Sequence, residues 1–345
     1  MVRVGILGAA GYTGGELLRV LVHHPEVSIV FANSESNAGN RVADVHEGLM
    51  GDTDLCFTDQ MPFGEVDVLF FCFGHGKSEA FLKEHAVPAG VKIIDLAQDF
   101  RIKGNHDYVY GLPETHREAI RQCAHLANPG CFATCVQLGL LPLAKAGLLT
   151  DDIAVNAITG STGAGQKPGA TTHFSWRNDN MSVYKLFQHQ HLHEICQTLN
   201  ELRPASAPAV CDTLSAVPAK GEISVDFIPY RGDFARGIFC TEVIRLQGEE
   251  GSAANPTADR LAELYRDFYR DAAFTHYVDT ALDLKQVVGT NKALVHLDKF
   301  NGNKVVVTSV IDNLLKGAVG QAVQNMNLMF GLDEKAGLNL KAIAF

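Results

Sequence analysis

Short apolar runs alternate with helical patterns over residues 2–158. Two of the runs contain almost no polar residue, as strands buried on both faces of a parallel sheet require. Helical stretches begin at Thr13 and near Ser78, between such runs. This order predicts an α/β unit built on a doubly wound parallel sheet. Its predicted strands are Val2–Leu7, Val27–Ala32, Val66–Phe73 and Val91–Leu96.

The pattern changes after Thr150. A stretch rich in Gly, Ser and Thr spans residues 160–172, and a His-rich helix is predicted at residues 188–203. A hairpin is expected further on, because two strand-like runs flank FNGN, whose Asn-Gly pair suits a tight turn. The later strands predict a mixed, largely antiparallel sheet. They are Val225–Tyr230, Gly237–Leu246, Ala293–Lys299 and Lys304–Ile311.

Two more helices are predicted towards the C-terminus. One spans residues 258–270, after a polar stretch that reads as an exposed loop. The other spans Asn313–Phe330, with Gly331 placed to cap it. Its apolar residues recur at helical spacing. They are Leu315, Val319, Ala322, Met326 and Met329.

Composition narrows the class of protein. A length of 345 residues suggests two domains, and a net charge of -10 argues against binding to nucleic-acid phosphates or to anionic membranes. No apolar run approaches the roughly 20 residues of a membrane span, and the N-terminus does not resemble a signal peptide. Eight scattered cysteines without a C-x-x-C pair are expected to be reduced. We therefore expect a soluble, cytoplasmic protein.

A glycine-rich loop follows the first predicted strand. Gly8, Gly11 and Gly14 lie in GILGAAGYTGGELL, between that strand and a helix. Glycines in this position allow backbone N–H groups to approach a pyrophosphate at the positive end of the helix. The spacing differs from G-x-G-x-x-G, so a tight turn without a ligand is the competing interpretation. The βαβ context favours a dinucleotide.

The end of the second predicted strand bears on the choice of dinucleotide. NAD-selective sites place an acidic residue there to bind the ribose 2′-hydroxyl. This chain has Asn33 and Ser34 at that point, and Arg41 could add positive charge. Glu35 is an acid close by, which weakens the argument. The sequence favours NADP over NAD.

The sequence NPGCFAT places a thiol at the predicted start of a helix. The helix dipole and the unpaired N–H groups of its first turn stabilise a thiolate at Cys131. Gly130 leaves room for a substrate, and Pro129 fixes the approach of the chain. Cys135 lies one turn further along an apolar helix and is expected to be a core residue.

A nucleophilic thiolate also needs a group that donates and accepts protons. FQHQHLHEI supplies His189, His191 and His193, with Glu194 adjacent. Metal binding is the alternative for this cluster. The H-E-x-x-H spacing is absent and no third ligand is marked, so no metal is expected. A solvent-exposed helix end remains the alternative for at least one of the histidines.

These motifs, together with DNLLKGAVGQAVQN near the C-terminus, resemble those of the N-acetyl-gamma-glutamyl-phosphate reductases, from Val2 to about Gly331. That family belongs to the aspartate-semialdehyde dehydrogenase-like superfamily. The resemblance implies a Rossmann-type NADP-binding domain of residues 1–129 with 312–345. It also implies a catalytic and oligomerisation domain of residues 130–311, an α+β fold like that of glyceraldehyde-3-phosphate dehydrogenase. A homodimer or homotetramer is implied as well.

The resemblance also implies an activity and a set of site residues. The activity is the NADPH-dependent reductive dephosphorylation of N-acetyl-L-glutamyl 5-phosphate to the 5-semialdehyde, through a cysteine thioester, in arginine biosynthesis. The implied catalytic residues are Cys131, His191 and His189. The implied substrate-binding residues are Arg101 in DLAQDFR, Arg236 in FARG, and Glu194. The implied cofactor-binding residues are Gly8, Ala9, Gly11, Tyr12, Thr13, Gly14, Ser34, Ser36, Ser161, Gly163 and Asn313.

The sequence departs from the family pattern beside the histidines. The family more often has His-Arg-His-x-Pro-Glu, where this chain has Gln190 and His193. The changed pocket wall leaves the N-acyl group open, with acetyl as the default and succinyl as an alternative. Two other activities are alternatives: aspartate-semialdehyde dehydrogenase, and a thiol hydrolase or acyltransferase. A dinucleotide-sensing protein without turnover is a further one.

Overall fold

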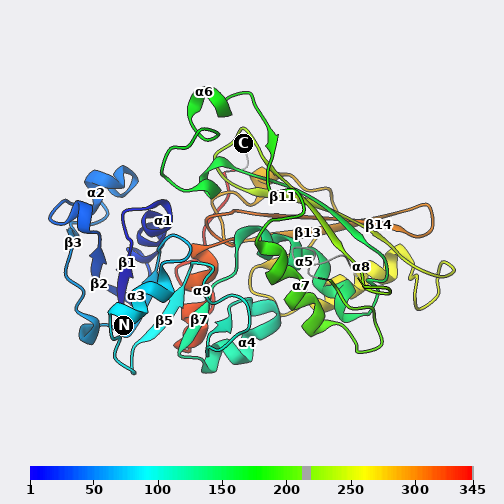
Figure 1. Ribbon diagram of the computed structural model, residues 1–345, viewed down its shortest axis with the longest axis horizontal. Helices are drawn as coiled ribbons and strands as arrows, with labels where there is room; N and C mark the ends of the chain where they lie inside the picture. The colour runs from blue at the N-terminus through cyan, green and yellow to red at the C-terminus, as the bar shows by residue number, and fades with distance from the viewer. Residues whose placement is uncertain (212–218, 344–345) are drawn as a thin grey trace. The chain divides into compact units, whose positions relative to one another are not determined.

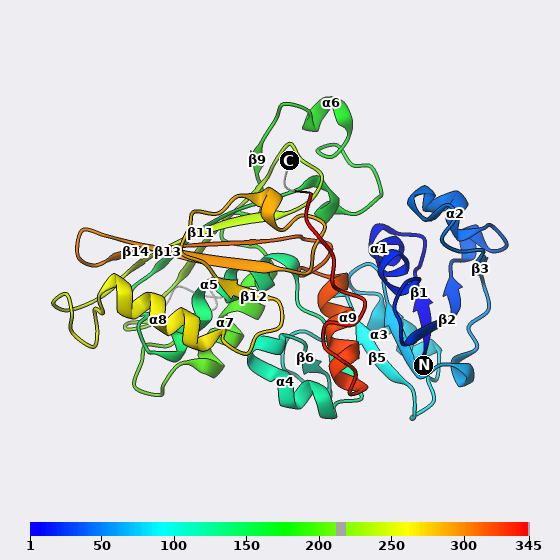
Figure 2. The same cartoon turned by 180° about the vertical axis from the view of Figure 1, so that it is seen from behind.

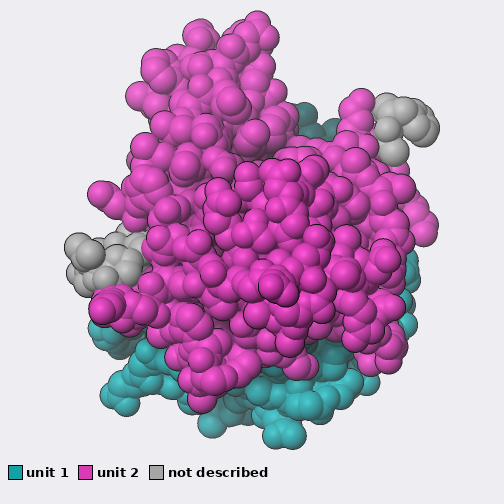
Figure 3. Space-filling view, turned by 90° about the vertical axis from the view of Figure 1, so that its right-hand side faces the viewer, with its two compact units in different colours: residues 1–130, 318–340 teal, residues 131–317, 341–345 magenta. Residues whose placement is uncertain are grey.

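A computed structural model of the chain describes residues 1–211 and 219–343. The chain divides into two compact units, shown in different colours in Figure 3. Unit 1 comprises residues 1–130 and 318–340, and unit 2 comprises residues 131–317 and 341–345. Unit 2 therefore contains the predicted thiol and histidines, and unit 1 contains the glycine loop.

Among the described residues of unit 1, seven strands form one parallel sheet in the order β3-β2-β1-β4-β5-β7-β6 (Figure 1). The order reverses between β1 and β4, as in a doubly wound sheet. The predicted parallel sheet is thus confirmed. Its strands are β1 (Val2–Leu7), β2 (Val27–Asn33), β3 (Phe57–Thr58), β4 (Val68–Phe71), β5 (Lys92–Asp95), β6 (Val109–Tyr110) and β7 (His125–Ala127).

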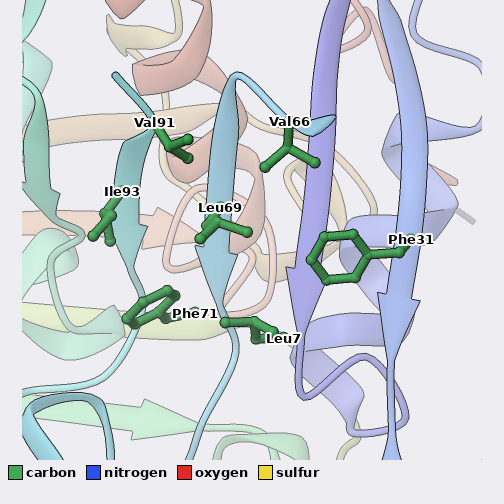
Figure 4. Packing of buried hydrophobic residues seen from close by; sticks show 7 residues of the cluster. All are labelled: Leu7, Phe31, Val66, Leu69, Phe71, Val91 and Ile93. Atoms are coloured by element: carbon green, nitrogen blue, oxygen red, sulfur yellow. The ribbon is translucent and has the colours of Figure 1, made fainter. Parts of the chain in front are cut away.

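Apolar side chains of adjacent strands pack on this sheet, as Figure 4 shows. Each is at most 6% exposed. Burial of this apolar surface fixes the register of the strands, because a slip of one residue would turn every side chain to the other face. The cluster consists of Leu7, Phe31, Val66, Leu69, Phe71, Val91 and Ile93.

The helices of unit 1 include one that returns from the C-terminal end of the chain. This helix, α9, contacts α1 and α4. It begins at Val319, so the prediction of a helix from Asn313 was wrong for the first turns. The helix starts late because the buried Asp312 carboxylate accepts hydrogen bonds from the backbone N–H groups of Leu314 and Leu315. These bonds hold a turn before the helix. The helices are α1 (Tyr12–Leu21), α2 (Val42–Val45), α3 (Ser78–Glu84), α4 (Pro113–Gln122) and α9 (Val319–Met329).

Gly331 ends α9 as predicted. Its φ of 66° is in the left-handed region, which suits glycine. The N–H of Leu332 then donates to the carbonyl of Asn327 at 2.8 Å. This bond satisfies a carbonyl that the end of the helix would otherwise leave unpaired.

In unit 2, seven described strands form a mixed sheet in the order β12-β13-β14-β11-β8-β10-β9 (Figure 2). Four of the six pairings are antiparallel, which confirms the predicted sheet. Asn301 and Gly302 both have positive φ at the predicted hairpin turn. The strands are β8 (Ile153–Thr159), β9 (Ser182–Val183), β10 (Val225–Arg231), β11 (Ile238–Arg245), β12 (Thr275–Tyr277), β13 (Ala293–Phe300) and β14 (Lys304–Ile311).

Helices α5, α7 and α8 contact strands of the unit 2 sheet. Residues along β8 alternate between buried and half-buried, so one face of this strand is more covered than the other. The helices of unit 2 are α5 (Cys131–Lys145), α6 (Phe174–Arg177), α7 (His191–Leu202) and α8 (Ala258–Phe268). Short 3₁₀ helices lie at Glu35–Asn37, Glu47–Leu49, Phe63–Glu65, Ser161–Ala164 and Leu284–Gln286.

Candidate active site

Cys131 is the first residue of α5, as the sequence predicts. The side chain is half-buried. The backbone of Gly317 passes directly beside it: a Cβ at Gly317 would lie 2.9 Å from the Cβ of Cys131 and 2.8 Å from the carbonyl oxygen of Asn313. The 15-residue helix directs its N-terminal N–H groups and the positive end of its dipole towards this position. The arrangement favours a thiolate.

His189 and His191 lie at the start of α7, with ring centroids 4.5 Å apart. They are 4% and 5% exposed. The ring of Phe132, the neighbour of Cys131 in the chain, contacts both rings edge to face, at centroid distances of 5.4 Å and 6.3 Å. The thiol helix and the histidine helix therefore meet at this aromatic contact.

The two histidines have different hydrogen-bond settings. Nδ1 of His189 accepts the backbone N–H of His191 at 3.2 Å, so a neutral His189 carries its proton on Nε2. Nε2 of His191 lies 3.9 Å from Oε1 of Glu194, which is 2% exposed. A carboxylate at that distance favours a protonated His191. The pair can thus supply a fixed N–H donor at His189 and, at His191, an imidazolium that can release a proton and take it back.

Tyr184 contacts the aromatic rings around the predicted histidine site. Its ring is 5.7 Å from that of His189 and 6.5 Å from that of Phe132. Burial raises the pKa of the phenol, and a negative charge on Cys131 raises it further, while Arg231 lowers it by its charge and a hydrogen bond. The thiol sulfur is therefore close enough to act electrostatically on Tyr184.

Arg236, one of the predicted substrate arginines, is held by a buried acid. Its Nε and Nη2 each donate to the Asp312 carboxylate at 3.0 Å. Asp312 is fully buried and also accepts the N–H of Gly289 at 2.8 Å. The guanidinium is thus fixed in direction and much of its charge is balanced.

Residues 160–165, which include the predicted cofactor-binding residues Ser161 and Gly163, pack against residues 234–237 and Asn313. The N–H of Ser161 donates to Phe234 at 2.8 Å. Asn313 donates from Nδ2 to the Thr162 hydroxyl at 3.0 Å and accepts the N–H of Gly237 at 2.7 Å. A Cβ at Gly163 would lie 3.9 Å from Nδ2 of Asn313. Ser161, Gly163 and Asn313 therefore form one cluster.

The glycine loop of unit 1 has the geometry of a phosphate cradle. Gly8 has a φ of +77°, and a Cβ there would lie 2.8 Å from the carbonyl oxygen of Cys72. A Cβ at Gly14 would lie 2.5 Å from Ala9, so the loop can pass this close only without side chains. Gly11 is the N-cap of α1, which presents the first-turn N–H groups of Tyr12 and Thr13. These residues fit a dinucleotide pyrophosphate.

The other predicted residues of unit 1 lie as follows. Ser34 is 8% exposed at the end of β2, and its hydroxyl and that of Ser36 both accept hydrogen bonds from Asn37. Arg41 forms an exposed ion pair with Asp54. Arg101 is 5% exposed and donates to the carbonyl of Leu96 at 2.8 Å.

Four residues near these sites were not identified from the sequence. Tyr184 and Arg231 lie in segments without a recognisable motif, and Asp312 was included only as the first residue of the DNLLKGAVGQAVQN motif. His46 contacts the glycine loop, because its Nε2 lies 2.9 Å from the carbonyl oxygen of Ala9. The tight Gly14-Gly15 pair was the available signal, since a Cβ at Gly15 would lie 2.5 Å from the His46 ring.

Two family models match most of the chain. The model described as "Semialdehyde dehydrogenase, NAD binding domain" matches residues 3–123, and "Semialdehyde dehydrogenase, dimerisation domain" matches residues 131–313. Full-length relatives named N-acetyl-gamma-glutamyl-phosphate reductase are 57% identical in Phocaeicola vulgatus, 56% in Bacteroides thetaiotaomicron and 52% in Christiangramia forsetii. The alignments cover 99–100% of this chain and of each relative. The chain belongs to the N-acetyl-gamma-glutamyl-phosphate reductase family.

Solved structures with this fold include more distant members of the superfamily. Aspartate semialdehyde dehydrogenase II of Vibrio cholerae aligns with a TM-score of 0.70 at 19% identity, over 96% of this chain and 98% of that one. The Candida albicans enzyme, solved with NADP, has a TM-score of 0.64 at 16% identity, over 98% and 99% of the two chains. At this identity the likeness establishes the fold.

Two further observations concern the described part of this reductase-family chain. No helix there has the length and hydrophobicity that crossing a membrane requires. Within the same residues, no group of three or more His, Cys, Asp and Glu side chains is arranged to hold a metal ion.

Proposed function

We propose that the protein reduces an N-acyl-L-glutamyl 5-phosphate to the 5-semialdehyde with NADPH. The observation that carries this proposal is that Phe132, which follows Cys131 at the start of α5, contacts the rings of both His189 and His191. The names of the full-length relatives support the substrate class. The glycine loop, and the absence of an acid at Asn33 and Ser34, support NADPH as the reductant.

The first half of the reaction transfers the acyl group to sulfur. The Cys131 thiolate attacks the carbonyl carbon of the acyl phosphate, a C–S bond forms, and the C–O bond to phosphate breaks. Arginine balances the charge of the departing phosphate, and Arg101 is our first choice from the sequence. Bound NADPH supplies the hydride that the resulting thioester accepts.

The histidines act on the proton of the reduced intermediate. The Nε2–H of a neutral His189 donates a hydrogen bond to the oxygen that becomes negative when the thioester is reduced. We favour His191, protonated beside Glu194, as the acid that gives this oxygen a proton, and the neutral His191 that remains is the base that takes the proton back. The C–S bond breaks, the aldehyde leaves, and the thiolate of Cys131 is restored.

We propose that the units correspond to the two domains expected from the sequence, with cofactor binding in unit 1 and the thiol in unit 2. The dimerisation model that matches residues 131–313 supports a homo-oligomer. The less covered face of the unit 2 sheet, including Ala154, Asn156 and Ile158, is the surface that we propose a second copy packs against. Light scattering distinguishes a dimer from a tetramer. The cytoplasmic location stays a prediction.

The N-acyl group is acetyl by default. Gln190 accepts a hydrogen bond from Lys185 at 2.7 Å, so this departure from the family pattern has its own local partner. The test is NADP⁺ reduction with N-acetyl- and N-succinyl-glutamate semialdehyde, in the presence of phosphate or arsenate. The proposal predicts anion-dependent turnover of at least one of them. Turnover of aspartate semialdehyde alone would identify the rival dehydrogenase. Hydrolysis of an added thioester, with no NADP⁺ reduction on any semialdehyde, would identify a thiol hydrolase.

A further inference from the structure

Unit 2 contains two arginines near the thiol in very different electrostatic settings. Arg236 is joined to the buried Asp312 by two hydrogen bonds, so its positive charge is already balanced. Arg231, five residues earlier, forms no ion pair with any described residue. An anionic ligand therefore gains more from Arg231 than from Arg236.

The position of the Arg231 guanidinium is fixed by an aromatic ring. It lies over Tyr184, 4.7 Å from the ring centroid. A guanidinium stacked on a ring keeps its edge, with several N–H donors, open for a planar anion. Its Nε is buried and has no hydrogen-bond partner within residues 1–211 and 219–343. A buried donor of this kind costs free energy unless a ligand pairs with it.

A second arginine adds positive charge beside Arg231. Arg177 is 5% exposed, and burial together with the charge of Arg231 lowers its pKa. Arg177 donates from Nη1 to the carbonyl of Arg231 at 2.8 Å, so it holds the Arg231 backbone in place. The nearby acid, Asp233, accepts the N–H of Asp179 at 2.7 Å. The charge of Asp233 acts on Arg177, but neither arginine forms an ion pair with a residue in the described part of the chain.

The Tyr184 ring, over which Arg231 lies, also contacts one of the proposed catalytic histidines. Tyr184 contacts His189 edge to face and responds to charge on Cys131. Arg231 pairs across the sheet with Thr159, which leads directly into residues 160–165. Arg231 and His189 therefore both contact the Tyr184 ring, so a group bound at Arg231 lies close to the histidines.

We propose that Arg231 is an additional substrate-binding residue that holds a carboxylate of the substrate remote from the reacting carbonyl, with Tyr184 as the ring that positions it. This inference rests on the proposed function. The carboxylate has two sources: the α-carboxylate of every N-acylglutamyl substrate, or the terminal carboxylate of a charged acyl group such as succinyl.

The experiment measures KM for N-acetyl- and N-succinyl-glutamate semialdehyde, and for phosphate, with the full-length protein and its variants. Arg231→Gln removes the charge, and Arg231→Lys keeps the charge without the planar fork. Tyr184→Phe keeps the stacking ring, and Tyr184→Leu removes it. Arg245→Gln, at the exposed far end of β11, is the matched control. Thermal unfolding and NADPH binding by fluorescence check that each variant is folded.

We expect Arg231→Gln to raise KM for a semialdehyde by about 10- to 100-fold, the range for loss of a charge-assisted hydrogen-bond pair. Arg231→Lys should give a smaller rise, and kcat should change much less than KM. Tyr184→Leu should raise the same KM, and Tyr184→Phe should have little effect. An equal rise for both semialdehydes identifies the α-carboxylate, and a rise for the succinyl compound alone identifies the acyl carboxylate.

The inference is overturned if, for both semialdehydes, KM of Arg231→Gln is no higher than KM of the Arg245→Gln control. It is also overturned if only KM for phosphate rises, because Arg231 would then bind the leaving group. If the wild-type protein turns over no semialdehyde, the proposed function fails instead. Calorimetry with N-acetyl- and N-succinyl-glutamate then tests Arg231 directly, and unchanged affinity in Arg231→Gln rejects its role.

Discussion

The Asp95 carboxyl makes the stability of unit 1 depend on pH in an unusual direction. Asp95 ends β5 in the DLAQDFR motif and is fully buried. Its Oδ1 accepts the Ser78 hydroxyl at 2.7 Å and the Ala97 N–H at 3.0 Å, while Oδ2 has no partner among the described residues. Burial raises the pKa of this carboxyl from 3.8 to about 6, although those hydrogen bonds and Arg101 oppose the rise. The charged form is therefore disfavoured in the folded protein.

The sign and size of the effect follow from this pKa. The folded state binds the proton more tightly than the unfolded state, so stability increases as the pH falls through 6 and levels off below 3.8. The full difference is about 3 kcal/mol, of which about 1.4 kcal/mol is gained between pH 7.5 and pH 5. Asp95→Asn is uncharged at both values and resembles the protonated acid. The variant should lack this increment.

Urea unfolding of the wild type and of Asp95→Asn gives the free energy of unfolding of each at pH 7.5 and pH 5. The increment is the change in this free energy between the two pH values in the wild type, minus the same change in Asp95→Asn. Asp67→Asn is the matched control, because Arg3 holds the pKa of Asp67 below 3.8 and this carboxylate stays ionised from pH 7.5 to pH 5 in both states. Asp67→Asn should therefore keep the pH dependence of the wild type over this range. The reasoning is refuted if Asp95→Asn keeps the whole pH dependence of the wild type, or if Asp67→Asn loses as much of it as Asp95→Asn does.

Three further substitutions have expected outcomes. Gly8→Ala should weaken NADPH binding at least tenfold in a fluorescence titration, because the new Cβ meets the Cys72 carbonyl at a φ of +77°. Gly317→Ala should lower both kcat and the melting temperature, since its Cβ would meet the Asn313 backbone and displace Cys131; an unchanged kcat would contradict this. Tyr265→Phe removes the buried hydrogen bond to the Gly139 carbonyl and should cost about 1–2 kcal/mol in urea unfolding, with activity retained.

The sequence predicted most of the fold because its signals were local. Buried parallel strands such as β4 read as apolar runs, and the Asn-Gly turn marked the hairpin of β13 and β14. The very short strands β3, β6 and β12 could not be predicted, because two or three residues carry no periodicity. The early part of the last helix was predicted wrongly, since only tertiary contacts show that Asp312 holds a turn.

The residues of the candidate site were predictable only where they belong to a short sequence motif. Cys131 at a helix start and the paired histidines are of this kind. The pairing of Arg236 with Asp312 joins residues 76 positions apart, and the stacking of Arg231 on Tyr184 crosses between β10 and the segment after β9. No spacing rule in a single sequence connects such residues. Which arginine has its charge balanced can be read only from coordinates.

The most direct test of the account is whether Cys131 carries the acyl group. The protein is mixed with NADP⁺ and the accepted semialdehyde, without phosphate or arsenate. The account predicts a burst of about one NADPH per subunit and an acyl adduct on the peptide containing Cys131, which phosphate then discharges. Reduction of NADP⁺ with no adduct at Cys131, or a full burst from Cys131→Ala, would contradict the central claim.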